Sequence, residues 1–332
     1  MLKNSSILIT GGTGSFGKTF IPLTLEKFSP KRIVIYSRDE MKQWDLAQKY
    51  SDDSRVQFII GDVRDKDRLT RALDGIDYVV HAAATKIVTT AECNPFECVK
   101  TNINGAMDLI DACIDKNVKR VVALSTDKAS NPINLYGATK LASDKLFVSA
   151  NPYAGTHDTR FSVVRYGNVM GSRGSVIPFF LSLGDKKELP ITDERMTRFM
   201  ITLEQGVELV WHAFDNMLGG EIYVKKIPSM GILDVARAVV PDARHKIIGI
   251  RPGEKIHEQM IGPEDAPHTY GYDDHYKILP MIHNWSLDPA RIKDGKRVPD
   301  DFVYSSDKNV DWMSVDELHS WIESNRNKIG LI

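Results

Sequence analysis

The chain has 332 residues, of which 42% are hydrophobic and 26% are charged, enough apolar material for one or two domains with a sizeable core. The formal net charge of −1 gives no overall attraction to nucleic acid or to a membrane surface, so we expect neither as a partner. No apolar run is long enough to cross a bilayer, and Cys93, Cys98 and Cys113 lack the spacing of a disulfide framework or a metal site. We therefore expect a cytoplasmic protein and, because no two of the nine histidines form a ligand pattern, no bound metal.

The first half of the chain alternates between short apolar runs and helix-like segments. Strands are expected at residues 7–10, 32–36, 56–60, 78–81, 120–124 and 161–165. The clearest helices are expected at residues 16–28, 40–50, about 95–116 and about 134–150. Continuous apolar strands that alternate with helices predict an α/β fold with a parallel sheet covered on both faces.

The second half of the chain has a looser pattern, with frequent Pro and Gly and longer polar loops after about Gly167. We therefore expect two units, residues 1–166 and residues 167–332, the second being mainly a smaller lobe over the carboxyl edge of the sheet. The boundary is soft, because the apolar segment 221–224 is a candidate to return to the main sheet.

A glycine-rich loop follows the first expected strand and opens the first expected helix. Its glycines permit a tight turn and a close approach of the backbone to the pyrophosphate of a dinucleotide, which then faces the helix N-terminus. The loop residues expected at the cofactor are Gly11, Thr13, Gly14, Ser15, Phe16 and Gly17. An ordinary strand-to-helix turn is the alternative, but this context favours a Rossmann-type, doubly wound nucleotide-binding domain over residues 1–166, with the substrate mainly bound by residues 167–332.

The second expected strand ends in Ser37-Arg38-Asp39, where a Rossmann fold contacts the adenosine ribose. An acidic residue here accepts a hydrogen bond from the 2′-hydroxyl of NAD, whereas an arginine accommodates the 2′-phosphate of NADP. Because Ser37 and Arg38 come first and Lys42 lies one helical turn later, we expect NADP rather than NAD. The alternative is a solvated helix start capped by Asp39. Further cofactor contacts are expected from Asp62, Val63 and Ala82.

A cluster of proton-carrying side chains follows the expected strand 120–124. Tyr136 and Lys140 are four residues apart, so on a helix they share one face. Such a tyrosine can act as the base for an alcohol that loses a hydride, because a neighbouring ammonium and an oxidised nicotinamide lower the pKa of a phenol. Thr126 or Ser125 can hydrogen-bond the same oxygen. Without this role, Tyr136 is an aromatic residue at a helix start and Lys140 is a surface lysine.

Together these motifs resemble the extended short-chain dehydrogenase/reductase family. More narrowly, segments 125–129, 131–136, 165–168 and 171–176 are similar to those of the configuration-inverting UDP-N-acetylglucosamine 4,6-dehydratases, and the similarity continues at 192–199 and 249–255. It covers nearly the whole chain to about Met260. The resemblance implies a lyase that recycles tightly bound NADP, dehydrates UDP-N-acetylglucosamine with inversion at C5, and opens a route to pseudaminic acid for flagellin or surface glycans.

Within this resemblance, Asp127 and Lys128 separate a dehydratase from an epimerase. Oxidation at C4 makes the C5 proton acidic, so elimination needs a base at C5 and an acid at the C6 hydroxyl. Lys128 suits the base and Asp127 the acid, and a lysine in place of the glutamate of retaining relatives implies inversion. For this role we expect burial, Lys140 or the cofactor to hold the pKa of Lys128 well below its ordinary value. Otherwise Lys128 is an exposed loop charge and Asp127 a cap.

The resemblance also assigns further contacts to cofactor and substrate. At the cofactor it places Lys86, Thr101 and Asn102, with Lys86 also near the sugar. The expected substrate contacts are Lys86, Asn168, Arg173, Val176, Arg198, Arg251 and Glu254, of which the arginines suit a diphosphate or uridine and Glu254 a ribose. The chain departs from the family pattern at Thr85, Ile87 and Thr89, on the N-acetyl or C6 side of the sugar pocket.

Two other functions stay open on sequence grounds. A UDP-N-acetylhexosamine 4-epimerase needs only the Tyr/Lys pair and a hydroxyl, and a non-catalytic NADP sensor would bind a protein partner. We also expect a homo-oligomer, a dimer or higher, because such relatives pair through the helices that correspond to residues 95–116 and 134–150.

Overall fold

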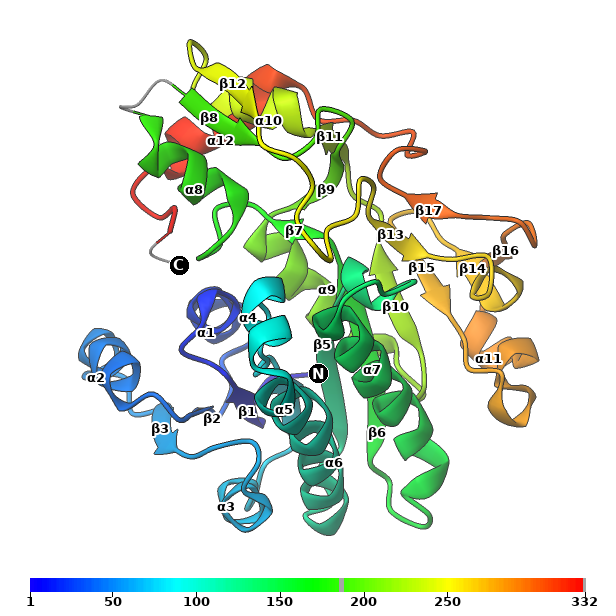
Figure 1. Cartoon of the computed structure of the whole chain (residues 1–332). Helices are drawn as coiled ribbons and strands as arrows, with labels where there is room; N and C mark the ends of the chain where they lie inside the picture. The colour runs from blue at the N-terminus through cyan, green and yellow to red at the C-terminus, as the bar shows by residue number, and fades with distance from the viewer. Residues whose placement is uncertain (185–187, 331–332) are drawn as a thin grey trace.

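The computed structural model describes residues 1–184 and 188–330. Within these residues, a ten-stranded sheet runs through the molecule, and smaller sheets with their own helices lie beyond its carboxyl edge (Figure 1). No helix in the described ranges is both long and apolar enough to cross a membrane.

The parallel half of the main sheet is built from six strands of the first half of the chain. Their order is β3-β2-β1-β4-β5-β6, with bounds β1 (Ser6–Thr10), β2 (Arg32–Ser37), β3 (Val56–Ile60), β4 (Tyr78–His81), β5 (Arg120–Thr126) and β6 (Arg160–Tyr166). All five residues of β1 are buried, as expected for a central strand with helices on both faces. This order is that of a doubly wound nucleotide-binding sheet, so the predicted fold class is confirmed.

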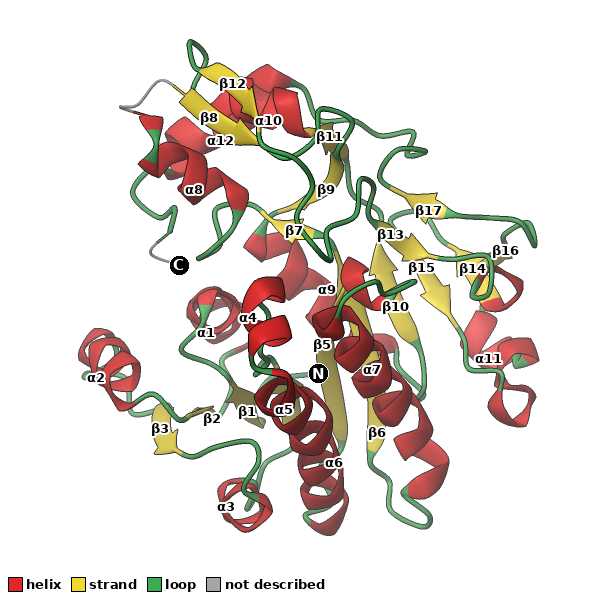
Figure 2. Cartoon of the chain, viewed as in Figure 1, coloured by secondary structure: helices red, strands yellow, loops and turns green. Residues whose placement is uncertain are grey.

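Helices cover both faces of this sheet. The helices of the first half are α1 (Ser15–Phe28), α2 (Glu40–Lys49), α3 (Lys66–Ala72), α4 (Val88–Cys93), α5 (Pro95–Val99), α6 (Gly105–Asp115) and α7 (Leu135–Tyr153). Helix α6 packs beside both α3 and α7 on one face, whereas α1 packs beside α9 (Leu203–Asn216) on the other (Figure 2). The single helix expected over 95–116 is instead α5 and α6 joined by a π-helical turn, η1 (Lys100–Asn104).

Later segments return to the main sheet, as segment 221–224 suggested. Strand β10 (Ile222–Lys225) pairs parallel to β6, and its register sets Tyr223 opposite Val164. Three antiparallel strands that were not predicted then extend the sheet in the order β15 (His275–Ile278), β14 (Thr269–Gly271) and β16 (Lys296–Arg297). The short turn η4 (Ala266–His268) leads into β14, and η5 (Ile282–Leu287) and α11 (Pro289–Ile292) lie between β15 and β16.

The remaining elements form a smaller lobe with its own hydrophobic core. Its strands are β7 (Asn168–Val169), β9 (Thr197–Ile201) and β11 (Ser229–Gly231) in one sheet, and β8 (Glu188–Ile191) with β12 (Arg244–Ile247) in another. Its helices are α8 (Val176–Ser182), α10 (Ile232–Val239) and α12 (Val315–Asn325). Phe180, Met200, Met230 and Leu318 are buried in the core between them. The boundary expected after residue 166 stays a prediction, since the main sheet takes strands from both sides of it.

A short antiparallel pair, β13 (Gln259–Ile261) with β17 (Tyr304–Ser305), fixes the segment that precedes it. Strand β13 packs against the turn η2 (Asp127–Ala129), which follows directly after β5. Residues 255–258, far along the chain, are therefore held against the carboxyl end of the central strand.

Arg165 of β6 is a fully buried cation that joins these parts. Its guanidinium lies 3.2 Å from a carboxylate oxygen of Asp144 on α7, donates to the carbonyl of Met260 at 2.7 Å, and lies 3.4 Å from Asp265. The same Asp144 oxygen accepts a hydrogen bond from Ser125 at 2.7 Å. Because both charges of the pair are buried, each depends on the other for compensation.

We predict that Arg165→Met destabilises the protein by about 3–5 kcal/mol, because it leaves the Asp144 carboxylate buried without its cation. Urea unfolding followed by circular dichroism measures the loss. The control is Arg160→Met at the partly exposed start of the same strand, whose ion pair with Asp158 is worth at most about 1 kcal/mol. Equal losses in the two variants would contradict the role given to the buried pair.

Candidate active site

The glycine-rich loop lies between β1 and α1 and has the conformation that only glycine allows at two positions. Gly11 has a φ of +66°, and a Cβ there would lie 2.8 Å from the amide nitrogen of Ala83. A Cβ on Gly17 would overlap the carbonyl of Gly12. Gly14 is the N-cap of α1 and has no side chain in front of the helix start. The backbone amides at this helix start are thus available to an anion, as the predicted pyrophosphate site requires. Phe16 packs on Phe20 inside the core.

The end of β2 carries the charges expected near an adenosine ribose. The Ser37 hydroxyl lies 3.0 Å from that of Thr13, which joins the strand end to the glycine loop. Arg38 is exposed and its nearest acid is Asp62 at 3.7 Å. Asp39 caps α2 by accepting from the amide of Lys42, so the alternative expectation for Asp39 as a cap is confirmed, and the Lys42 ammonium also lies against it at 2.5 Å.

Asp62 and Val63 follow β3. The Asp62 carboxylate pairs with Arg64 at 2.7 Å, and this hydrogen-bonded ion pair holds the pKa of Asp62 below its ordinary value. Val63 is buried against Gly105 at the start of α6.

The loop after β4 is held by Asn102 of η1. The Asn102 side chain accepts from the amide of Thr85 at 2.8 Å and donates to its carbonyl at 3.0 Å, and it also donates to Thr139 at 3.0 Å. Its polar atoms therefore position the loop rather than point into open space. Thr101 is buried beside it, and Ala82 lies against the glycine loop, with its amide donating to Thr10.

Lys86, in the same loop, reaches across to the smaller lobe. Its ammonium donates to the carbonyl of Arg173 at 3.1 Å, and the Arg173 amide lies 3.4 Å from the hydroxyl of Ser15. Lys86 is exposed as a whole, but partial desolvation of its ammonium and the nearby Arg173 lower its pKa. Ile87, at the point where the chain departs from the family pattern, is the N-cap of α4 and is 54% exposed.

Tyr136 and Lys140 lie on the first turns of α7, and both are buried. The Lys140 ammonium donates to the carbonyl of Leu124 on β5 at 2.8 Å. The Thr126 hydroxyl lies close enough to the Tyr136 phenol to act on its pKa, and it donates to Oδ1 of Asp127 at 2.9 Å, so the two residues expected to share the substrate oxygen lie together. Helix α7 can lie this close because Gly137 faces η2, where a Cβ would overlap the carbonyl of Lys128.

One electrostatic expectation for Tyr136 is wrong in this structure. We expected Lys140 to lower the pKa of the phenol, but burial raises the pKa of Tyr136 to about 12, and the cation that opposes this rise is Lys128. Lys140 instead has its own pKa lowered by burial, with Asp144 opposing. The reason is geometric, since the Lys140 ammonium is directed at a backbone carbonyl of the neighbouring strand.

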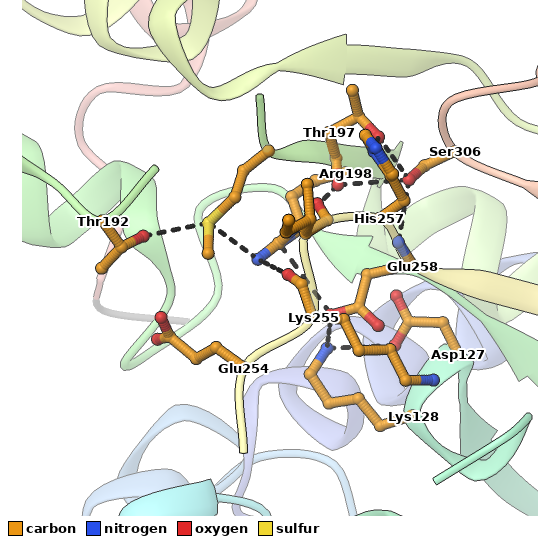
Figure 3. A network of polar contacts seen from close by, with 12 residues as sticks. Asp127, Lys128, Thr192, Thr197, Arg198, Glu254, Lys255, His257, Glu258 and Ser306 are labelled. Carbon is orange, nitrogen blue, oxygen red and sulfur yellow. Dashed lines mark hydrogen bonds and ion pairs between the residues drawn. The ribbon is translucent and has the colours of Figure 1, made fainter. Parts of the chain in front are cut away.

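Asp127 and Lys128 form η2, directly after β5, and a third side chain joins them (Figure 3). The Lys128 Nζ lies 3.1 Å from Oδ1 of Asp127 and 3.2 Å from Oε1 of Glu258. Asp127 is 1% exposed and Glu258 is 3% exposed, whereas the Lys128 side chain keeps 24% of its surface. The structure thus places one ammonium between two buried carboxylates, and Asp127 and Lys128 are neither a simple cap nor an exposed loop charge.

The expected low pKa of Lys128 is also wrong in this structure. Burial does act to lower the pKa of Lys128, but the carboxylates of Asp127 and Glu258 outweigh it, and the pKa is raised above its ordinary value. Sequence reasoning missed Glu258. The available signal was an acidic residue directly before the apolar β13, three residues beyond the segment 249–255.

The residues expected at the substrate are only partly grouped. Arg198 points into the same network, donating to the carbonyls of Thr197 and Ile256 and lying 3.9 Å from Glu258. Arg251 and Glu254 face each other at 3.8 Å in a more exposed loop. Val176 begins α8.

Asn168 of β7 has a buried Oδ1 that no described residue hydrogen-bonds, so this oxygen is one candidate for a substrate contact. In the described part of the chain, no three His, Cys, Asp or Glu side chains are grouped so that they could hold a metal ion.

Curated relatives match almost the whole chain. A protein named UDP-N-acetylglucosamine 4,6-dehydratase (inverting), from Campylobacter jejuni subsp. jejuni, is 55% identical over 326 residues, which cover 96% of this chain and 97% of the relative. A protein named UDP-glucose 4-epimerase, from Rickettsia canadensis, is 39% identical over 328 residues, which cover 96% of each.

Solved structures show the same fold. The X-ray structure of Pen from Bacillus thuringiensis is 35% identical and superposes with a TM-score of 0.90, covering 98% of this chain and 99% of that one. A dTDP-glucose 4,6-dehydratase from Streptomyces venezuelae, DesIV, solved with NAD and TYD bound, is 23% identical with a TM-score of 0.68, covering 76% of this chain and 86% of that one. The second likeness concerns the fold alone.

The family model described as polysaccharide biosynthesis protein matches residues 7–280, a range that includes the glycine loop, η2, Tyr136, Lys140 and Glu258. The chain therefore belongs to this family of polysaccharide biosynthesis proteins, on the extended short-chain dehydrogenase/reductase fold that its sequence predicted.

Proposed function

We propose that this chain is an inverting 4,6-dehydratase of UDP-N-acetylglucosamine, a hydro-lyase. The observation that carries the proposal is the position of Asp127 and Lys128, held together at 3.1 Å beside the Tyr136–Thr126 pair at the end of β5. The relative at 55% identity, which bears this name, supports the same activity.

The first half of the reaction is an oxidation at C4. A nicotinamide cofactor, when bound, accepts the C4 hydride and later returns it to C6. Tyr136 takes the proton of the C4 hydroxyl, and Thr126 orients that hydroxyl. Because burial raises the pKa of Tyr136 to about 12, little phenolate is present at neutral pH, and Tyr136 can accept the proton only when added positive charge lowers that pKa or when its own proton is passed on.

The second half is the loss of water. Once C4 is a ketone, the C5 proton becomes acidic, and Lys128 removes it while Asp127 protonates the departing C6 hydroxyl. Asp127 suits the acid, because burial and Glu258 raise its pKa above the ordinary value, although Lys128 opposes this. The Oδ2 of Asp127 is buried without a hydrogen-bond partner among the described residues, which leaves it available to the leaving hydroxyl.

A UDP-hexose 4-epimerase is the second candidate, and the relative named UDP-glucose 4-epimerase at 39% identity favours it. An epimerase needs the Tyr136–Lys140 pair but no acid and base at C6 and C5. The buried Asp127–Lys128 pair would then serve only the fold, although burying an ion pair is costly unless both partners are well compensated.

For the cofactor we propose NADP, with NAD as the alternative. Arg38, which is exposed just after β2 and 3.7 Å from Asp62, supplies positive charge for a 2′-phosphate, and Lys42 in the first turn of α2 adds to it once the phosphate competes with Asp39. On the substrate side, we propose that Lys86, Asn168 and Arg173 contact the sugar or diphosphate. Arg198, Arg251 and Glu254 would then surround the uridine end, although Arg198 is also bound to backbone carbonyls. A role in pseudaminic acid synthesis, a cytoplasmic location and a homo-oligomer through segments 95–116 and 134–150 stay predictions.

The proposed reaction predicts a defined product in deuterated water. Incubation with UDP-N-acetylglucosamine should give a 4-keto sugar with a methyl group at C6, the L-arabino configuration at C5 and one solvent deuteron at C5. Proton NMR reads all three properties in one sample. A 4-epimer with an intact C6 hydroxyl would establish the epimerase instead, and a D-configured product would contradict inversion.

We predict that Lys128→Met stops elimination but not oxidation. Reduced cofactor should accumulate and be visible by the absorbance of the reduced nicotinamide. Product formation should fall about 100-fold or more. Stopped-flow absorbance and product NMR measure the two steps separately. Lys3→Met, an exposed lysine far from the site, is the control. Dehydration at the wild-type rate in Lys128→Met would falsify the role of Lys128.

The cofactor proposal predicts that Arg38→Ala weakens NADP binding about 10-fold or more, since a charged contact to the 2′-phosphate is lost, and leaves NAD binding nearly unchanged. Isothermal titration calorimetry with both nucleotides measures the difference. Arg55→Ala, a surface arginine paired with Asp53, is the matched control. An equal change for NAD and NADP would rule out recognition of the phosphate by Arg38.

A further inference from the structure

Glu258 is a buried carboxylate with no part in the reaction as described so far. Its Oε1 lies 3.2 Å from the Lys128 ammonium, while Oε2 is buried and unpartnered among the described residues. Asp127 mirrors this arrangement, with Oδ1 at the same ammonium and Oδ2 buried and unpartnered. Two carboxylates therefore lie at nearly the same distance from the Lys128 ammonium. Only Asp127 has been given a role in the reaction so far.

Glu258 is held in place by hydrogen bonds on its own backbone. Its amide donates to the Ser306 hydroxyl at 2.9 Å, and its carbonyl accepts from the Ser306 amide at 2.8 Å. Lys255, three residues earlier, donates to the carbonyl of Ser130 at 2.7 Å and so attaches the segment to the end of η2. This two-sided attachment directs the Glu258 side chain at Lys128 rather than at solvent (Figure 3).

The charges around the three groups favour one ionised carboxylate. Burial would raise the pKa of Glu258, but Lys128, Arg198 and Lys255 outweigh it, and the pKa is lowered. Glu258 in turn adds to the burial that raises the pKa of Asp127. The other titrating neighbour is Tyr136, which faces Lys128 from α7. Glu258 therefore gives up its proton more readily than an ordinary glutamate, whereas Lys128 and Asp127 hold theirs more tightly than usual.

Elimination needs an amine and a carboxylic acid at the same time. An ionised Asp127 could take a proton from Lys128 and so form both groups in one transfer. An Asp127 that already holds its proton cannot do this, and Lys128 then stays charged unless a second acceptor lies within reach. The Oε1 of Glu258, 3.2 Å from the ammonium, is such an acceptor.

We propose that Glu258 is a positioning residue that receives the proton Lys128 must lose before it can act as the C5 base, and that it keeps Asp127 protonated as the C6 acid. This rests on the proposed dehydratase function. When substrate displaces water, one N–H bond of Lys128 breaks and one O–H bond forms at Oε1 of Glu258. The three groups then carry the same number of protons as before but no separated charge, which a dry site favours.

The proton inventory closes over a turnover without any external reagent. The lone pair of Lys128 takes the C5 proton, and Asp127 gives its proton to the departing hydroxyl, which leaves as water. A solvent-derived proton adds to C5 on the opposite face as the hydride returns to C6, and Tyr136 releases to solvent the proton that it took from the C4 hydroxyl. Lys128, which has kept the C5 proton, gives one proton to the ionised Asp127 and takes the one held by Glu258, so every group returns to its starting state.

The variants that test this are Glu258→Gln, which removes the acceptor, and Glu258→Asp, which keeps a carboxylate on a shorter stem. Glu264→Gln, an exposed glutamate on the same segment, is the control. The first readout needs no substrate: the rate at which an amine-acylating reagent labels Lys128 is measured by mass spectrometry across a pH series. The second uses UDP-N-acetylglucosamine and follows cofactor reduction and water loss separately against pH.

In Glu258→Gln we expect Lys128 to be labelled at lower pH than in the wild type, because a carboxylate that raises its pKa is gone. Elimination should fall about 100-fold or more, cofactor reduction should change only a few-fold, and the basic limb of the elimination profile should move to lower pH, because the pKa of Asp127 falls as well. Glu258→Asp should recover part of the rate and of the pH profile.

Two outcomes would overturn the proposal. Unchanged labelling of Lys128 in Glu258→Gln would show that the carboxylate does not control this amine, and this result does not depend on the enzyme's reaction. Equal loss of reduction and elimination with an unmoved pH profile would show a purely structural role. If the wild type fails to dehydrate the substrate while the labelling still shifts, the dehydratase function fails but the coupling of Glu258 to Lys128 stands.

Discussion

The placement of one ammonium between two buried carboxylates is the constraint on which the site depends. Two opposite charges about 4 Å apart attract by about 4 kcal/mol at the effective dielectric of a protein surface, and by more where water is excluded. Lys128 therefore stays in place only while Asp127 and Glu258 both reach it, and each carboxylate tolerates burial only because of Lys128. The end of β5, the start of α7 and the segment before β13 must meet for this balance to hold.

The contacts that join the residues around η2 and β4 to the later segments of the chain are accordingly polar. Lys255 is bound to a carbonyl of η2, Arg198 to carbonyls of the segment that follows Glu254, and Lys86 to a carbonyl of the smaller lobe. Each contact uses a fixed backbone acceptor rather than a mobile side chain. Such polar contacts can fix the geometry of a site without a large apolar interface, which would exclude a charged sugar nucleotide from that site.

The sequence predicted the central strands well, because each is a short apolar run without the helical spacing of apolar residues. It predicted the glycine loop because a side chain at Gly11 or Gly17 would clash with neighbouring backbone. It missed the strands β14 to β16, which are two to four residues long and partly polar. It read residues 95–116 as one helix, since a π-turn leaves no mark in apolar periodicity.

The residues proposed as catalytic divide in the same way. Asp127, Lys128, Tyr136 and Lys140 are close in sequence, so their proximity in space followed from one strand end and one helix face. Glu258 came from a distant segment with no spacing signal. The pKa directions of Tyr136 and Lys128 were wrong because they depend on which neighbours the tertiary structure supplies: a backbone carbonyl for Lys140, and a second carboxylate for Lys128.

The distance along the chain between η2 and Glu258 has a consequence for biosynthesis. A nascent chain that has folded β1 to β6 already has the nucleotide-binding loop, Asp127 and Lys128, but not the counter-charge or the Ser306 clamp that sets it. The sheet also still lacks β10 and β15 on the flank of β6. The cluster around Lys128 is therefore completed only after the segment that carries Glu258 and Ser306 has been synthesised and has packed against η2.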